Sequence, residues 1–256
     1  MNVLFVLILL FLLLTFAVFR QAGLFQVTGI FINVMIFVLV LVLIDQGLPI
    51  LLVTSAGFLT VAAITLFFIN GVNAKTKVAF FCVTVFFLFC LLVLPLLIEG
   101  IGIQGFAHEE LDELAMYDFD VPFDFSALAF AIILMSFSGA VADGSMAIST
   151  ATYELLQADP TLSFQALRQS SFRIVSEVLS STINTLLFAF MGSNLALIIW
   201  FQDVRESFAT LINAKSFAAE VVICLVTGMA AVVILPITAI CASWYFYRGK
   251  SDLEKK

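Results

Sequence analysis

Long apolar runs separated by shorter polar segments dominate the sequence. Seven runs carry almost no charge: residues 3–19, 27–44, 49–70, 78–98, 125–147, 175–200 and 218–246. A helix needs about 20 residues to cross a hydrocarbon core of ~30 Å, so each run is long enough for one crossing. The runs are continuously apolar rather than alternating, which favours helices over the strands of a barrel. The pattern predicts an all-α membrane protein, a polytopic bundle of about seven transmembrane helices forming one domain over residues 1–256.

The composition agrees with a bilayer environment. Hydrophobic residues make up 63% of the chain and charged residues 11%, whereas soluble domains carry about 25% charged residues. The first run lacks a basic region before it and has no small-residue cleavage site after it. We therefore expect it to be a retained helix rather than a secretory signal.

The basic residues are unevenly divided between the loops. Placing the odd-numbered loops and the C-terminal tail in the cytoplasm gives 9 Lys and Arg inside and 2 outside. The positive-inside rule then predicts that the N-terminus lies outside and the C-terminus inside. We expect a multi-pass protein of the cytoplasmic membrane, with the lipid bilayer as its surroundings.

Two longer loops are predicted between the later helices. The extracytoplasmic loop 99–124 contains eight carboxylates and no Lys or Arg. These acids either remain hydrated and fix the topology, or form an electrostatic funnel for cations or a cationic partner. The cytoplasmic loop 151–173 is predicted to contain a short surface helix, with Asp159 as its N-cap and Pro160 at its first position.

Polar and small residues recur at helical spacing in the fifth and sixth runs. In the fifth run the stripe consists of Ser136, Ala140, Asp143, Ala147, Thr150 and Glu154. In the sixth it consists of Ser170, Arg173, Glu177, Ser180 and Asn184. Counted along the helices, Asp143 and Glu177 fall at similar depth. The candidate site is therefore an intramembrane polar cluster of Asp143, Glu177, Asn184 and Arg173.

Ionisable residues inside a membrane are costly and usually face a bundle interior or water. Two roles remain open for this cluster. It is either a hydrogen-bonded clasp between the fifth and sixth helices or a relay for protons or cations, and the two are compatible.

The same residues resemble a known family. The segment "GAVADGSMAIST", followed about thirty residues later by "SSFRIVSEVLSSTINTLLFAFMG", resembles the YibE/F family of bacterial integral membrane proteins. The matching positions are Gly139, Ala140, Asp143, Met146, Ile148, Ser149, Asn184, Thr185, Leu186, Ala189 and Gly192. Where the family tends to show Gly-Arg-Asp, this chain has Val175, Ser176 and Glu177. The resemblance implies a shorter, YibF-like member, partnered by a longer YibE-like paralogue or forming a homo-oligomer.

Two functions are compatible with these features. The first is a subunit of a membrane transport or export complex that uses intramembrane acids; the second is a non-transporting scaffold or receptor subunit with an acidic outer loop. We expect no enzyme, because the single histidine, His108, lies in the outer loop, away from any intramembrane serine. No nucleotide or metal motif is present, so no cofactor or metal is expected. The low isoelectric point argues against nucleic-acid binding.

The four cysteines fall within apolar runs without Cys-x-x-Cys spacing: Cys82, Cys90, Cys224 and Cys241. We expect them to pack as small hydrophobic residues, without a disulfide or a zinc site.

Overall fold

The computed structural model describes residues 3–101, 124–196, 199 and 208–253. The described elements are all helical: α1 (Val3–Phe19), α2 (Gln21–Asp45), α3 (Ile50–Ala63), the π-helical η1 (Ile64–Ile69), α4 (Ala74–Ile101), α6 (Phe125–Ala158), α7 (Phe164–Ser193), α9 (Phe208–Asn213) and α10 (Lys215–Leu253). Within these ranges, six helices are long and apolar enough to cross a membrane, η1 continuing the span that α3 begins. The chain is thus an all-α polytopic bundle, as the sequence predicts.

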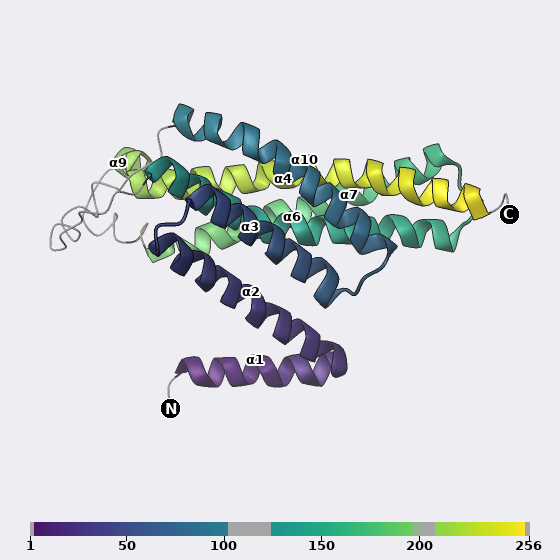
Figure 1. The fold of residues 1–256 in the computed structure, drawn as a ribbon, viewed down its shortest axis with the longest axis horizontal. Helices are drawn as coiled ribbons and strands as arrows, with labels where there is room; N and C mark the ends of the chain where they lie inside the picture. The colour runs from purple at the N-terminus through teal and green to yellow at the C-terminus, as the bar shows by residue number, and fades with distance from the viewer. Residues whose placement is uncertain (1–2, 102–123, 197–198, 200–207, 254–256) are drawn as a thin grey trace.

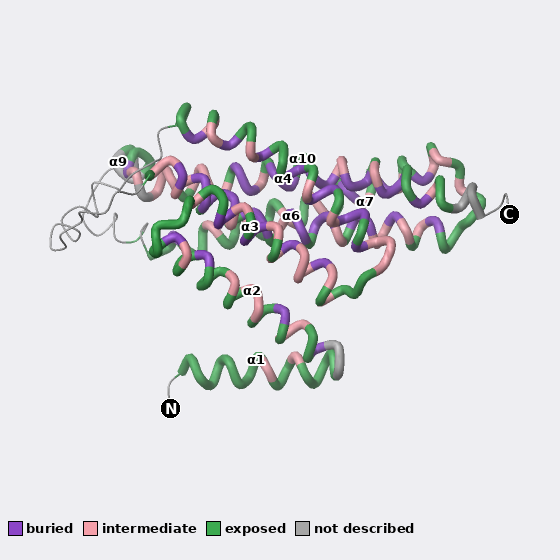
Figure 2. Tube along the Cα trace, viewed as in Figure 1, coloured by how far each residue is buried: buried purple, intermediate pink, exposed green. Residues whose placement is uncertain are grey.

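Helix α6 lies at the centre of the bundle, and α3, α4, α7 and α10 all pack against it. Figure 1 shows α6, α7 and α10 running along the long axis of the molecule, α2, α3 and α4 slanting across that direction, and α1 folded back beneath α2. Helix α1 has no buried residue and is shorter than the six long spans. Figure 2 shows α1 coloured almost entirely as exposed.

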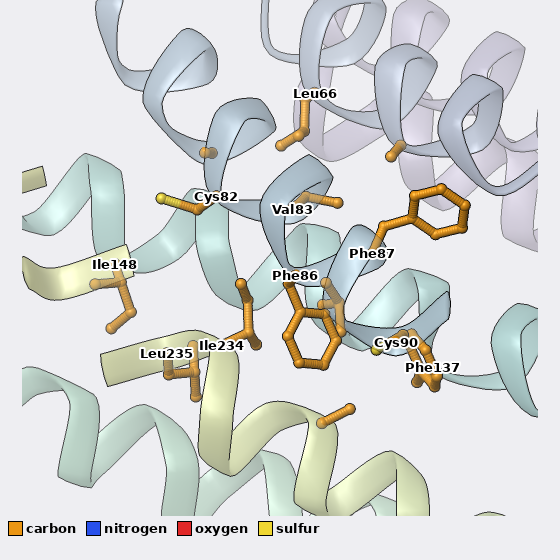
Figure 3. Close-up of a cluster of buried hydrophobic side chains, with 14 of the residues drawn as sticks. Leu66, Cys82, Val83, Phe86, Phe87, Cys90, Phe137, Ile148, Ile234 and Leu235 are labelled. Atoms are coloured by element: carbon orange, nitrogen blue, oxygen red, sulfur yellow. The ribbon is translucent and has the colours of Figure 1, made fainter. Parts of the chain in front are cut away.

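Phenylalanine side chains form the centre of the core between α3, α4 and α6. The Phe58 ring stacks on Phe87 at 5.1 Å between centroids and meets Phe137 edge-on at 5.9 Å. Figure 3 shows how side chains from α4, α6 and α10 close around this cluster. Burying large rings in the middle of three helices gives α6 its fixed position.

Helix α2 is held to the bundle by close packing on α3 and η1. Gly57 lets Val40 approach so closely that an added Cβ would lie 2.6 Å from its Cγ2. Near the middle of α2, the Asn33 amide nitrogen donates a hydrogen bond to Thr65 Oγ1 at 3.1 Å. Small residues and single hydrogen bonds are typical of helix packing in lipid.

The predicted cytoplasmic loop 151–173 is wrong in its extent. Helix α6 continues to Ala158 and α7 begins at Phe164, so only residues 159–163 separate them. Asp159 is the C-cap of α6 rather than an N-cap, and its Oδ1 accepts hydrogen bonds from the backbone nitrogen and hydroxyl of Thr161. The N-cap of α7 is Ser163, whose Oγ accepts from the Ala166 nitrogen. Polar residues beyond the apolar run therefore prolong both helices past the bilayer.

Most of the predicted acidic loop 99–124 lies outside the described residues. Its two ends are described: Glu99 belongs to α4, and Asp124 caps α6 by accepting hydrogen bonds from the nitrogens of Ser126 and Ala127.

One end of the bundle collects basic and aromatic side chains. Lys75 lies over the Tyr153 ring at 5.1 Å, Arg168 over Phe164 at 6.0 Å and Arg248 over Trp244 at 5.4 Å. This basic end is where α4 and α7 begin and where α6 and α10 end. Aromatic and basic residues gather where a membrane meets water, so this end fits the predicted cytoplasmic side.

Candidate functional site on α6 and α7

A set of hydroxyl groups joins α6 to its neighbours inside the bundle. Ser149 Oγ donates to the backbone carbonyl of Lys75 at 2.8 Å, which links α6 to α4. Ser145 Oγ accepts from Thr238 Oγ1 at 3.3 Å, which links α6 to α10. Both serines are fully buried. The buried polar face of α6 is therefore a packing surface.

Three helices meet at the hydroxyl of Ser171 on α7. Its Oγ accepts from Thr152 Oγ1 of α6 at 3.1 Å and from Ser243 Oγ of α10 at 3.4 Å, while it donates to the Leu167 carbonyl. All three hydroxyl side chains are buried. This junction fixes the register between α6 and α7 near the basic end.

The polar stripe predicted on α6 lies on the opposite face of the helix. Ser136, Asp143, Ala147 and Glu154 are exposed, and Ala140 and Thr150 are partly exposed. The face that packs instead carries Ser145, Ser149 and Thr152. The stripe therefore points away from the core of the chain.

The polar stripe predicted on α7 is also on the outer surface. Arg173, Glu177, Ser180 and Asn184 are exposed, and the buried residues of α7 are Leu167, Ser171 and Val175. Beyond Val175 the helix keeps contact with the bundle chiefly through α10, as in the contact between the Phe190 and Phe217 rings at 5.8 Å.

The Thr152–Ser171 contact gives the relative depth of the four candidate residues. Because α6 and α7 are antiparallel neighbours, residues equally far from this contact lie at about the same height. Asp143 and Ser180 are both nine residues away, about 14 Å at 1.5 Å per residue. Glu177 lies six residues from the contact, about 9 Å, and Asn184 thirteen residues, about 20 Å. The two acids thus differ in depth by roughly one helical turn, and both lie toward the basic end of the apolar runs 125–147 and 175–200.

The predicted clasp between α6 and α7 does not form within one chain. Among the residues that the structure describes, Asp143, Arg173, Glu177 and Asn184 make no hydrogen bond or ion pair. The ion pair found in this part of the chain joins Lys75 Nζ to Glu154 Oε1 at 3.3 Å, at the basic end. The clasp does not form because α10 packs close beside Gly144, and this contact turns the serine face of α6 inward. An added Cβ at Gly144 would lie only 2.8 Å from Leu235 Cδ2.

An exposed carboxylate at this depth meets lipid, a second protein or water. Facing lipid, a carboxylate costs ~2.5–3.5 kcal/mol at a helix centre and less toward the membrane surface, and binding a proton or a cation neutralises its charge. No group of three or more potential metal ligands is found within the described residues. The acids of α6 and α7 therefore lie on the outer surface of this chain, where lipid, water or another protein would surround them.

Together, the helices and the outward-facing acids define a polytopic α-helical membrane protein with ionisable residues at membrane depth. The chain belongs to the YibE/F family: the model described as YibE/F-like protein matches residues 7–248. No curated protein and no solved structure matches the chain.

The inward-facing hydroxyl residues of α6 are the feature that the sequence-based prediction missed. Ser145, Ser149 and Thr152 follow steps of four and three residues, as the stripe containing Asp143 does. Hydroxyl residues at helical spacing therefore mark both faces of α6 equally. The charged residues drew attention to the other face.

Proposed function

We propose that this protein is a subunit of a membrane transport or export complex in the cytoplasmic membrane, and that Asp143 and Glu177 bind the proton or cation that drives it. The observation that carries the proposal is the position of two carboxylates on the outer surface of α6 and α7 at membrane depth. Ionisable residues inside membranes commonly mark ion pathways and proton relays.

The relay would work by alternating the charge of the two acids. A carboxylate that carries a proton or faces a cation tolerates an apolar surrounding, whereas a bare carboxylate needs water or a partner group. A change in occupancy at Asp143 or Glu177 would therefore change how strongly the outer faces of α6 and α7 attract a neighbouring helix. That coupling between ion binding and helix packing is what an energised membrane complex requires.

The test neutralises each acid without changing its shape. Asp143→Asn and Glu177→Gln should each abolish the ability to complement a deletion strain and the proton or cation flux of the reconstituted complex, while membrane insertion stays intact. Glu154→Gln is the matched control, because Glu154 lies on the same outer face of α6 but at the basic end, where its exposed ion pair with Lys75 contributes little.

Full complementation by both neutralised variants would overturn the relay. The scaffold alternative would then be tested by replacing the acids of the 99–124 loop with amides, which should remove binding of a cationic partner in a salt-dependent way.

A further inference from the structure

The exposed polar face of α7 follows a regular spacing that reaches almost to the end of the helix. Starting at residue 173, steps of four and three residues alternate and visit six positions, all exposed: Arg173, Glu177, Ser180, Asn184, Leu187 and Met191. We call this line the α7 seam. An average step of 3.5 residues is the spacing with which one helix packs along another in a left-handed pair.

The chemistry of the α7 seam favours a protein neighbour over lipid tails. A charged pair, a serine and an asparagine share this line, and within the described residues the charged pair and Asn184 are without a hydrogen bond. Lipid tails offer these groups no partner, whereas serine allows close approach and asparagine bonds across helices. The apolar positions Leu187 and Met191 continue the line toward the other end of the helix.

We infer that the α7 seam pairs with the α7 seam of a second copy of this chain. Two copies in one membrane are related by a two-fold axis along the bilayer normal, so each residue lies at the same depth as its own counterpart. Asn184 then meets Asn184 of the second copy, and an amide can donate to and accept from another amide. A single asparagine at such a position fixes the register and number of paired helices.

The charges on the seam are complementary to themselves under the same symmetry. Arg173 and Glu177 lie four residues apart, about 6 Å along the axis, within the reach of an arginine side chain. Arg173 of each copy therefore reaches Glu177 of the other, and the two-fold axis produces this pair twice. A charge pattern complementary to itself in this way selects a second copy as the occupant.

This inference deepens the proposed function, because it names the partner of the α7 surface that carries Glu177. It rests on the proposed function only in treating the chain as a subunit of a complex. Asp143 lies at the depth of Ser180, on the neighbouring helix. In the pair, Asp143 flanks the seam from each side, and a proton or cation that binds Glu177 competes with Arg173 of the second copy for the same carboxylate.

A disulfide cross-link tests which face of α7 meets the second copy. The native cysteines are replaced by alanine, and Leu187→Cys and Ala189→Cys are compared in sparsely loaded proteoliposomes under a mild copper-based oxidant. Both positions are exposed and nearly equal in depth, but Ala189 lies off the seam. Leu187→Cys should give a covalent dimer and Ala189→Cys at most a tenth as much. Equal yields would overturn the inference.

Charge exchange tests the same pairing with the native cysteines in place. Arg173→Glu and Glu177→Arg chains carry different tags and are expressed separately, together, and as the double variant. Each single variant should lose self-association, while the mixture and the double variant should recover it, since opposite charges again face one another. Asn184→Leu should weaken association about threefold, the effect of losing one ordinary interhelical hydrogen bond.

Failure of the mixture to copurify two tags, or retention of a different protein on the seam in place of a second copy, would overturn the inference. These measurements need no activity, so their failure is separate from failure of the relay. The relay is judged by flux and complementation, and stands or falls on Asp143 and Glu177.

Discussion

Helices α2 and α7 are similarly uncovered by the rest of the chain, yet their compositions are opposite. In the most apolar stretch of each, 11% of α2 and 6% of α7 is buried. Among the six long helices, α2 shares the highest hydropathy and α7 has the lowest. The exposed side of α2 carries Phe31, Met35 and Leu39, whereas that of α7 carries Glu177, Ser180 and Asn184.

The difference shows that the exposure of a side chain on a single chain does not tell whether lipid or another protein surrounds it. An apolar exposed face such as that of α2 is stable against lipid tails. A polar exposed face such as that of α7 gains nothing from lipid and is stabilised by a protein neighbour. In the proposed pair of two copies, α2 therefore lies at the lipid boundary and α7 at the interface between the copies.

The largest expected effect comes from making α2 resemble α7. Met35 is 51% exposed near the centre of α2. Met35→Asp should cost ~2.5–3.5 kcal/mol of insertion free energy, a roughly hundredfold fall in the equilibrium constant for insertion. An insertion assay on the full chain measures it, with Met35→Leu as the control. Normal insertion of Met35→Asp would mean that α2 also faces protein or water, and the comparison would fail.

A second change tests how α2 is attached to the bundle. Gly57→Val places new atoms against Val40 and should lower the free energy of unfolding by about 1–3 kcal/mol, as overpacking does. Thermal denaturation in detergent measures it. Gly228→Val on α10 is the matched control, because an added Cβ there meets nothing within 4 Å. Equal loss from both variants would show that helix propensity, and not the contact between α2 and α3, sets the stability.

The existence of the helices could be predicted from the sequence because a backbone in lipid must satisfy its own hydrogen bonds, so an apolar run of sufficient length is a helix. The ends of α6 and α7 at the basic end could not be predicted in this way. There the helices extend beyond the apolar runs, and local capping by Ser163 decides where α7 begins.

The orientation of α6 could not be predicted from spacing. The stripe containing Ser136 and Asp143 and the stripe containing Ser145 and Ser149 both follow helical steps. The choice between them depends on contacts with other helices, such as the close approach of Leu235 at Gly144. The charged residues of the candidate site were identified from the sequence, but their position on the outside required the packed bundle.

The smallest expected effect concerns the place where α7 is held to its own chain. Ser171→Ala removes the acceptor for Thr152 Oγ1 and Ser243 Oγ and leaves two buried hydroxyls with poorer partners. Interhelical hydrogen bonds in membrane proteins contribute about 0.6 kcal/mol on average, so the free energy of unfolding should fall by roughly that amount or slightly more. Reversible denaturation in mixed micelles is sensitive enough to measure it. Ser176→Ala on the exposed side of α7 should leave the monomer unchanged. If Ser176→Ala lowers the free energy of unfolding as much as Ser171→Ala does, the attachment of α7 to the bundle does not depend on this junction. In that case α7 and α2 are held to the bundle in more similar ways than their different compositions indicate.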